Sequence, residues 1–195
     1  MASYKGVNGV MTALEDFFKS RIPAELKGGS INARVKLLGS TDVSKPINGN
    51  VLGIYLHRVT VDPHGRNRHF TPVGSSSSTL TPELPIDLHF LLIATGSSAN
   101  IEADIISWAM VELANEAQLD ISHLIDSDSG WSEEELVTIN PEEMSTEDLM
   151  RIWDVFEAKY TITVPYLIRS VRLGLMTNTV PAPSVQTTVF PVGAV

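Results

Sequence analysis

Two side chains with the chemistry of a general base, Asp87 and His89, stand two positions apart in the apolar stretch Leu84–Thr95. Residues two apart on a β-strand point to the same face, so the carboxylate would orient the imidazole for proton transfer. The same spacing suits a polar pair that is hydrogen-bonded at the surface of a sheet, which is the commoner arrangement. We therefore expect a polar pair here and keep a catalytic dyad as the alternative.

The other residues that bind metals or cofactors show no working pattern. The histidines (His57, His64, His69, His89 and His123) lie on separate predicted elements without HxH or HExxH spacing, and the chain has no cysteine. Asp126–Gly130 resembles a calcium loop, but its ligand spacing and closing glutamate are out of register. No GxSxG, GxGxxG or Walker-type loop is present. The sequence predicts no catalytic, cofactor-binding or metal-binding residues, and hence no enzyme.

Arg66, Arg68 and His69 form a small basic cluster in a chain of net charge −9. The cluster is either a solvated hairpin tip or a docking loop that contacts an acidic neighbour. The acidic balance argues against binding to nucleic acid or to an anionic membrane, because both require a positive surface. Met1–Leu14 lacks the pattern of a signal peptide, and no window holds 18 consecutive apolar residues, so we expect no membrane span. The absence of cysteine suits assembly in a reducing cytoplasm.

Hydrophobic patterning predicts the elements that hold these residues. Apolar residues at helical spacing predict helices over 3–21 and 99–117, and a third helix that begins at Ser145 and packs through Leu149, Ile152, Trp153 and Phe156. Apolar, β-branched and alternating runs predict strands over 31–38, 51–62, 84–95, 135–139 and 160–175. The strand over 84–95 is expected at the centre of the sheet, covered on both faces. Pro165 has no N–H, so its end of the last strand is expected at a sheet edge or bulge. The fold class is α+β.

The C-terminal residues differ in kind from the rest of the chain. Residues 177–195 contain three prolines and no charged side chain, and Val185, Thr187 and Val189 alternate with Gln186, Thr188 and Phe190. We predict one domain over residues 1–176 and an extended arm over 177–195. The arm is either a disordered end or a strand that pairs with the sheet of another subunit.

The order of several segments resembles a known family. Ala-Leu and Phe-Phe in the first helix are followed by VLGIYLHRVTVD, LPIDLHFLLIATG, a helix containing WAMVEL, and LMRIWDVFEAKYTITVPYLIRSVRL. This order resembles the cap, or tail-terminator, proteins of extracellular contractile injection systems, the phage-tail-like particles of the antifeeding-prophage and Photorhabdus virulence cassette type. The resemblance covers residues 7–173 and does not extend to the arm.

The resemblance implies a structural role and a phage tail-terminator-like fold, with a mixed, largely antiparallel sheet flanked by helices. It implies a homo-oligomer, a hexameric ring, at the end of the particle distal to the baseplate, where the ring contacts the inner tube protein and the contractile sheath protein and ends their polymerisation. Such a particle is assembled in the bacterial cytoplasm and released extracellularly. The family offers no catalytic residues, and we take Arg66, Arg68, His69, Val185, Thr187, Val189 and Phe190 as candidate interface residues.

Two alternatives stay open. One is a related phage tail-completion or neck protein, which would be encoded beside capsid and portal genes. The other is a small hydrolase or ligand-binding module that uses Asp87, His89 and the loop around Arg66–Arg68. A deep cleft that contains Asp87 and His89 would favour this second alternative.

Overall fold

The computed structural model of the chain describes residues 2–62, 83–119, 124, 131, 136–156 and 159–174. The helices are α1 (Gly6–Arg21), α2 (Ala24–Lys27), α3 (Ser40–Val43), α5 (Ala99–Asn115) and α7 (Thr146–Val155). The strands are β1 (Arg34–Leu38), β2 (Val51–Val61), β3 (Glu83–Thr95), β4 (Gln118–Leu119), β5 (Val137–Pro141) and β6 (Ile162–Gly174). Residues 175–195 lie outside the described part, so the division into a domain and an arm stays a prediction.

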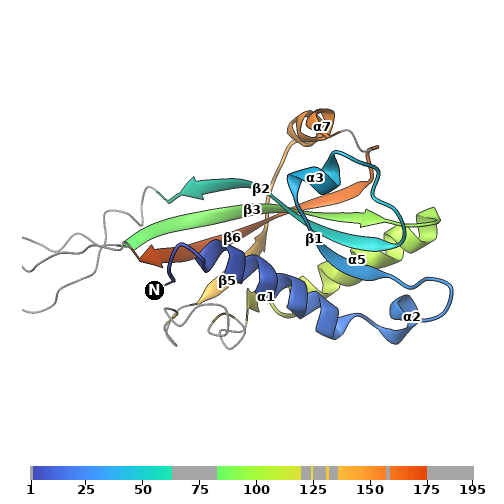
Figure 1. Ribbon diagram of the computed structural model, residues 1–195, viewed down its shortest axis with the longest axis horizontal. Coiled ribbons are helices and arrows are strands. Elements are labelled where there is room, and N and C mark those ends of the chain that lie inside the picture. Colours follow the sequence, from blue (N-terminus) through green and yellow to red (C-terminus); the bar gives the residue numbers. More distant parts are fainter. Residues whose placement is uncertain are drawn as a thin grey trace, which may run out of the picture.

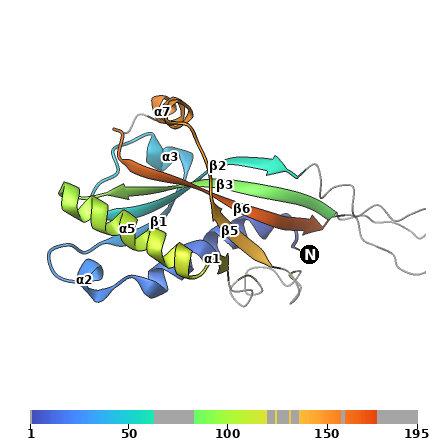
Figure 2. The same cartoon turned by 180° about the vertical axis from the view of Figure 1, so that it is seen from behind.

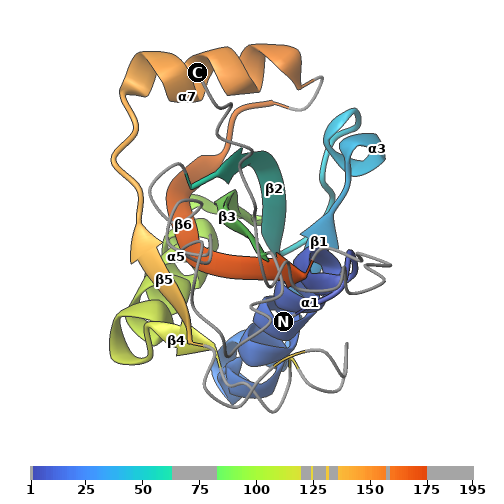
Figure 3. The ribbon, with the colours of Figure 1, turned by 90° about the vertical axis from the view of Figure 1, so that its left-hand side faces the viewer.

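The strands form one mixed sheet in the order β1-β2-β3-β6-β5-β4. β1 and β2 are parallel, and the other neighbouring pairs are antiparallel. β3 lies between β2 and β6, and its residues from Leu88 to Thr95 are buried. The α+β class, the largely antiparallel sheet and the central position of β3 are therefore confirmed. Seen along the sheet, the strands curl between helices on two sides (Figure 3).

The predicted apolar helices cover one face of the sheet. Figures 1 and 2 place α1 and α5 together on one side. From α1, Val10, Leu14 and Phe18 are fully buried in the core, and Phe18 meets Trp108 of α5 edge to face, with ring centroids 5.7 Å apart. Burying a Leu or Phe side chain stabilises the fold by about 1.5–3 kcal/mol. The apolar stripe of the first helix therefore packs on its own core, as predicted.

The other face is covered over part of its area by α7 and α3 (Figure 1). Trp153 is the buried residue of α7, and Leu149, Ile152 and Phe156 pack beside it against Leu91 and Ile93 of β3. The Oγ of Ser145 accepts a hydrogen bond from the backbone N–H of Asp148 at 3.1 Å, which caps the helix as predicted. This layer is smaller than the layer formed by α1 and α5, and it leaves part of the long strands uncovered.

The strand expected over 135–139 is found two residues later, as β5 (Val137–Pro141). Two further predicted boundaries differ from the structure for reasons that its contacts show. The strand expected over 31–38 begins only at Arg34, because Gly29 and Asn32 have positive φ and the N–H of Ala33 bonds the carbonyl of Leu26 in a turn. The first helix begins at Gly6 and not at Ser3, because Ala2 forms a parallel bridge with Leu173 of β6. A turn therefore takes the place of the first residues of the expected strand, and a bridge to β6 sets where the chain can enter the helix.

Pro165 occupies the position predicted for it. β5 pairs with β6 only over Tyr166–Arg169, so Ile162–Pro165 has β3 on one side and no described strand on the other. The carbonyl of Pro165 accepts a hydrogen bond from the N–H of Glu142, 3.1 Å away, where the chain leaves β5. A proline is tolerated at this local edge because no strand there requires an N–H from it.

Candidate functional site

His89 points to the face of the sheet that carries α7, and its ring is enclosed by polar partners. Its side chain is 8% exposed, its Nε2 lies 2.9 Å from Oγ1 of Thr60, and its Nδ1 lies 2.8 Å from Oε1 of Glu142. Asp87 is opposite Thr60 in the β2–β3 register. Both ring nitrogens of His89 thus have partners, which is the arrangement of a satisfied structural histidine.

The partners of His89 come from three separate segments. A register shift between Leu56 and Arg58 marks a bulge at His57, beyond which Arg58 lies opposite His89. Glu142 is the first residue after β5 and reaches the same place from the other side of β6. The sequence does not indicate the contact between Glu142 and His89, because the two residues are 53 positions apart. Burial of a carboxylate next to Pro141 is visible only in the structure.

The cluster of His57, Arg58, His89 and Glu142 is held together by charge. Nη2 of Arg58 lies 2.9 Å from Oε1 of Glu142 and 3.0 Å from Nδ1 of His89. Nε2 of His57 lies 4.0 Å from Oε2 of Glu142, and neither of these two atoms has a hydrogen-bond partner among the described residues. Burial lowers the pKa of His57, nearby His89 and Arg58 lower it further, and Glu142 opposes them. His57 is therefore held in its neutral form more strongly than an exposed histidine.

This cluster lacks the access that a catalytic dyad requires. A cavity of about 380 Å³ lies beside it, and its lining includes His57, Arg58, Glu142 and Asp148 but not His89 or Asp87. A general base must come within hydrogen-bond reach of a substrate proton, and both nitrogens of His89 are already occupied. The cleft that would favour a hydrolase, containing Asp87 and His89 together, is not formed by this cavity.

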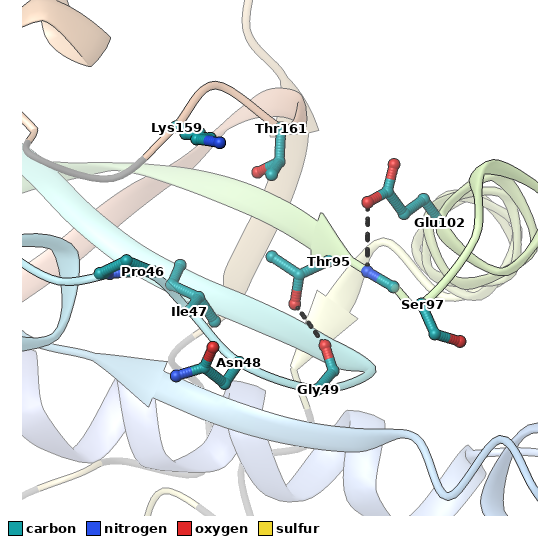
Figure 4. A pocket seen from close by; sticks show the side chains of 10 residues that line it. Pro46, Ile47, Asn48, Gly49, Thr95, Ser97, Glu102, Lys159 and Thr161 are labelled. Atoms are coloured by element: carbon teal, nitrogen blue, oxygen red, sulfur yellow. Dashed lines mark hydrogen bonds between the residues drawn. The ribbon is translucent and has the colours of Figure 1, made fainter.

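A second cavity, of about 500 Å³, lies where β3 ends and α5 begins (Figure 4). Its polar groups are used within the fold. Oγ1 of Thr95 donates to the carbonyl of Gly49 at 3.0 Å, and Oε1 of Glu102 accepts from the N–H of Gly96 at 3.2 Å. Lys159 and Thr161 line the opposite side. The cavity holds no nucleophile next to a base, so it forms no catalytic site of the kind considered for this chain.

Over the described residues, no group of three or more His, Cys, Asp or Glu side chains is arranged to hold a metal ion. The calcium-like segment Asp126–Gly130 lies outside those residues. No described helix has the length and apolar character needed to cross a membrane.

The interface residues predicted from sequence, Arg66, Arg68, His69, Val185, Thr187, Val189 and Phe190, all lie outside the described residues. The described strands nevertheless show where these segments join the fold. β2 ends at Val61, β3 begins at Glu83, and Gly174 at the end of β6 is opposite Glu83. Both segments are therefore attached at one end of the sheet, where β2, β3 and β6 extend beyond the helices (Figure 1).

At that end the two edges of the described sheet differ. β1 pairs with β2 only as far as Tyr55, whereas β2 remains paired with β3 up to Val61. The outer side of Leu56–Val61 thus has no strand partner among the described residues. Val59 and Val61 are each 47% exposed. The opposite edge, on β6, is bridged by Ala2, which accepts from Gly174 N–H at 2.7 Å and donates to the carbonyl of Arg172 at 3.2 Å.

The open edge of β2 is the feature that sequence reasoning missed. One signal was available, because the predicted strand over 51–62 is longer than the strand over 31–38 that became its neighbour. The sequence did not show that these two strands pair or that they pair in parallel. Until the two strands are known to pair, the greater length of the strand over 51–62 does not indicate an open edge.

The chain was compared with known proteins. A model of the family described as the Pvc16 N-terminal domain matches residues 9–187. The fold is similar to that of the sheath/tube terminator of PVC, an extracellular contractile injection system, in its extended state, with a TM-score of 0.56, 16% identity, and coverage of 97% of this chain and 65% of that one. It is also similar to the tube-terminating cap of the anti-feeding prophage, AFP, with a TM-score of 0.55, 14% identity, and coverage of 92% and 60%.

The similarity to the two solved proteins is partial in length and low in sequence identity. The chain spans less than two thirds of the length of both solved proteins. At 14–16% identity, the structural likeness shows a shared fold. A sequence search of curated proteins gives no match.

Proposed function

The chain belongs to the family of the Pvc16 N-terminal domain, and from that premise we propose that it is a structural subunit of the cap that terminates the tube and sheath of an extracellular contractile injection particle. The observation that carries this proposal is the family match over residues 9–187, together with the shared fold of two solved terminators. The order of segments that resembles the same cap proteins, over residues 7–173, points the same way. The proposed role is structural, in the assembly of the particle, and we propose no enzymatic activity.

We further propose that copies of the chain form a closed ring of six that contacts the last layers of sheath and inner tube. A ring of identical subunits uses head-to-tail contacts, which place different patches on the two sides of each subunit. The two edges of the sheet do differ at its free end: Leu56–Val61 of β2 has no strand partner among the described residues, and β6 is bridged by Ala2. The particle would act outside the cell that makes it.

The interface residues stay part of this proposal. Arg66, Arg68 and His69 would dock against an acidic neighbour, and the segment containing Val185, Thr187, Val189 and Phe190 would pair with a sheet edge. Their attachment at the end of the sheet beyond the helices supports a role in contacts between subunits, since that end is not enclosed by α1, α5 or α7.

Deletion of the encoding gene tests the proposal. We expect particles with inner tubes of irregular length in electron micrographs, and restoration of uniform length when the gene is supplied in trans. The purified chain is expected to form a closed ring whose mass corresponds to six copies. A strictly monomeric chain at high concentration, together with particles of normal length after the deletion, would overturn the proposal. Capsid and portal genes beside this gene would assign it instead to a phage tail.

A further inference from the structure

The open edge of β2 is exposed in a way that soluble proteins usually avoid. An edge strand is protected by charged side chains, by proline, by a bulge or by a covering segment, because its free N–H and C=O groups otherwise template pairing with another strand. Leu56–Val61 contains no proline, and its one charged side chain, Arg58, is engaged by Glu142 and His89. The bulge at His57 lies at the start of this segment, and beyond it Arg58–Val61 pairs with β3 in regular register. Val59 and Val61 add exposed apolar surface at the same place.

The same chain contains a segment suited to this edge. Ser184–Phe190 has seven residues, no charge and no proline, and it alternates Val185, Thr187 and Val189 with polar or aromatic residues. The open edge runs over six residues, so the two lengths match. Strand addition joins such partners through main-chain hydrogen bonds, while alternate side chains contact the faces of the sheet.

We infer that the open edge of β2, Leu56–Val61, is the acceptor for Ser184–Phe190 of a second copy of this chain. The acceptor is thus a strand of the same kind of subunit that donates the tail. The inference rests on the proposed function only in that it requires a neighbouring copy. β6 ends at Gly174 and runs parallel to β2, so a tail that paired with its own β2 in antiparallel fashion would have to reverse its direction within residues 175–183. Pro181 and Pro183 favour an extended course for that linker over such a reversal.

The arrangement is directional, as a ring requires. Each copy would donate at its C-terminus and accept along β2, so the contact of one copy with the next differs on its two sides and propagates until the ring closes. Pairing on the β6 side is blocked at the same end by the bridge between Ala2 and Leu173. Among the described residues at this end, the edge of β2 is the one left without a strand partner.

The chain contains no cysteine, so disulfide trapping is free of background thiols. Full-length chains carrying V59C are mixed with size-tagged chains carrying either T187C or T188C, which sample the two faces of the added strand. We expect a disulfide-linked heterodimer in one of the two mixtures, with the bond mapped by mass spectrometry. V111C on α5, at 55% exposure close to the 47% of Val59, is the matched control. We expect its yield to be lower by about tenfold or more.

A second pair of variants separates strand pairing from chance contact. The proline is placed beside whichever cysteine gives the heterodimer, as Thr187→Pro with T188C or Thr188→Pro with T187C. It removes an N–H from the added strand, and the heterodimer yield should fall by about tenfold, whereas Thr177→Pro, which lies before the segment, should leave it unchanged. Equal yields with V59C and V111C would overturn the inference. So would a disulfide that forms only within one molecule when both cysteines are placed in the same chain.

Ring mass and tube length are recorded on the same variants. A six-copy ring and tubes of uniform length without the specific disulfide would refute the strand exchange and leave the proposed function intact. Loss of ring and of length control in the unmodified chain would refute the proposed function itself.

Discussion

Oε1 of Glu142, the residue that follows β5, lies 2.8 Å from Nδ1 of His89 on the central strand β3. The same oxygen lies 2.9 Å from Nη2 of Arg58 on β2. One carboxylate therefore ties together three segments at the point where the cover formed by α7 ends. Hydrogen bonds to a charged partner in such a partly buried site are worth more than neutral ones at the surface.

Removal of this carboxylate is expected to weaken the fold. Glu142→Ala leaves Nδ1 of His89 and the guanidinium of Arg58 without this acceptor, and we expect a loss of about 1–3 kcal/mol in the free energy of unfolding. Urea denaturation followed by circular dichroism measures the change. Glu143→Ala, at the exposed neighbouring position, is the control and should stay within about 0.5 kcal/mol. Equal effects of the two variants would show that the cluster contributes no specific stability.

His57 makes stability depend on pH in one direction. Its pKa is lowered mainly by burial, so the unfolded chain binds this proton more readily than the folded chain does. The contribution of His57 is complete at pH above its unfolded pKa of about 6.5 and is lost as the pH falls through that value towards the lower folded pKa. We expect the urea midpoint to fall less steeply between neutral and mildly acidic pH in His57→Gln than in the unmodified chain. Parallel curves for the two proteins would contradict this assignment.

The cap of α7 is expected to hold that helix on the sheet. Ser145→Ala removes the acceptor for the Asp148 N–H and should cost about 1 kcal/mol. Because α7 packs through few residues, we expect the loss to appear first as faster hydrogen exchange of the α7 amides. Thr146→Ala, at the next position, removes a side chain for which no cap is described and serves as the control. Unchanged exchange in Ser145→Ala would mean that packing by Trp153 alone holds the helix.

Gly6 provides a test of the N-terminal bridge. A Cβ at this position would lie 2.6 Å from Cβ of Ala2 and 2.8 Å from Cδ2 of Leu173, so Gly6→Val forces Ala2 away from β6. We expect a destabilisation of about 1–3 kcal/mol. The amide of Gly174, which donates to the carbonyl of Ala2, should lose protection in hydrogen exchange. Lys5→Ala, an exposed change one position away, should retain that protection.

Secondary structure was largely predictable because its signals are local. The apolar stripe of α1, the β-branched run of β2, the continuous apolar run of β3 and the Ser145 cap each lie within a short window, and each formed the expected element. Pro165 was also placed correctly, since a missing N–H restricts a residue wherever the strand lies. Two of the boundaries that failed, at Ser3 and at Ile31–Ala33, failed because Ala2 bonds to the distant strand β6 and Ala33 closes a turn with Leu26.

The candidate site also has features that were predictable from the sequence and features that were not. Residue type and spacing were enough to predict that Asp87 and His89 share a face of a strand, and that the chain lacks GxSxG, GxGxxG and Walker-type motifs. The assembled fold was needed to show that His89 is partnered by Glu142 and Thr60, and that β2 extends beyond its pairing with β1 to an edge without a described partner. These relationships join residues tens of positions apart, and they depend on which strands become neighbours and where each pairing stops. Strand order and register are properties of the assembled sheet, and no single segment of the sequence contains them.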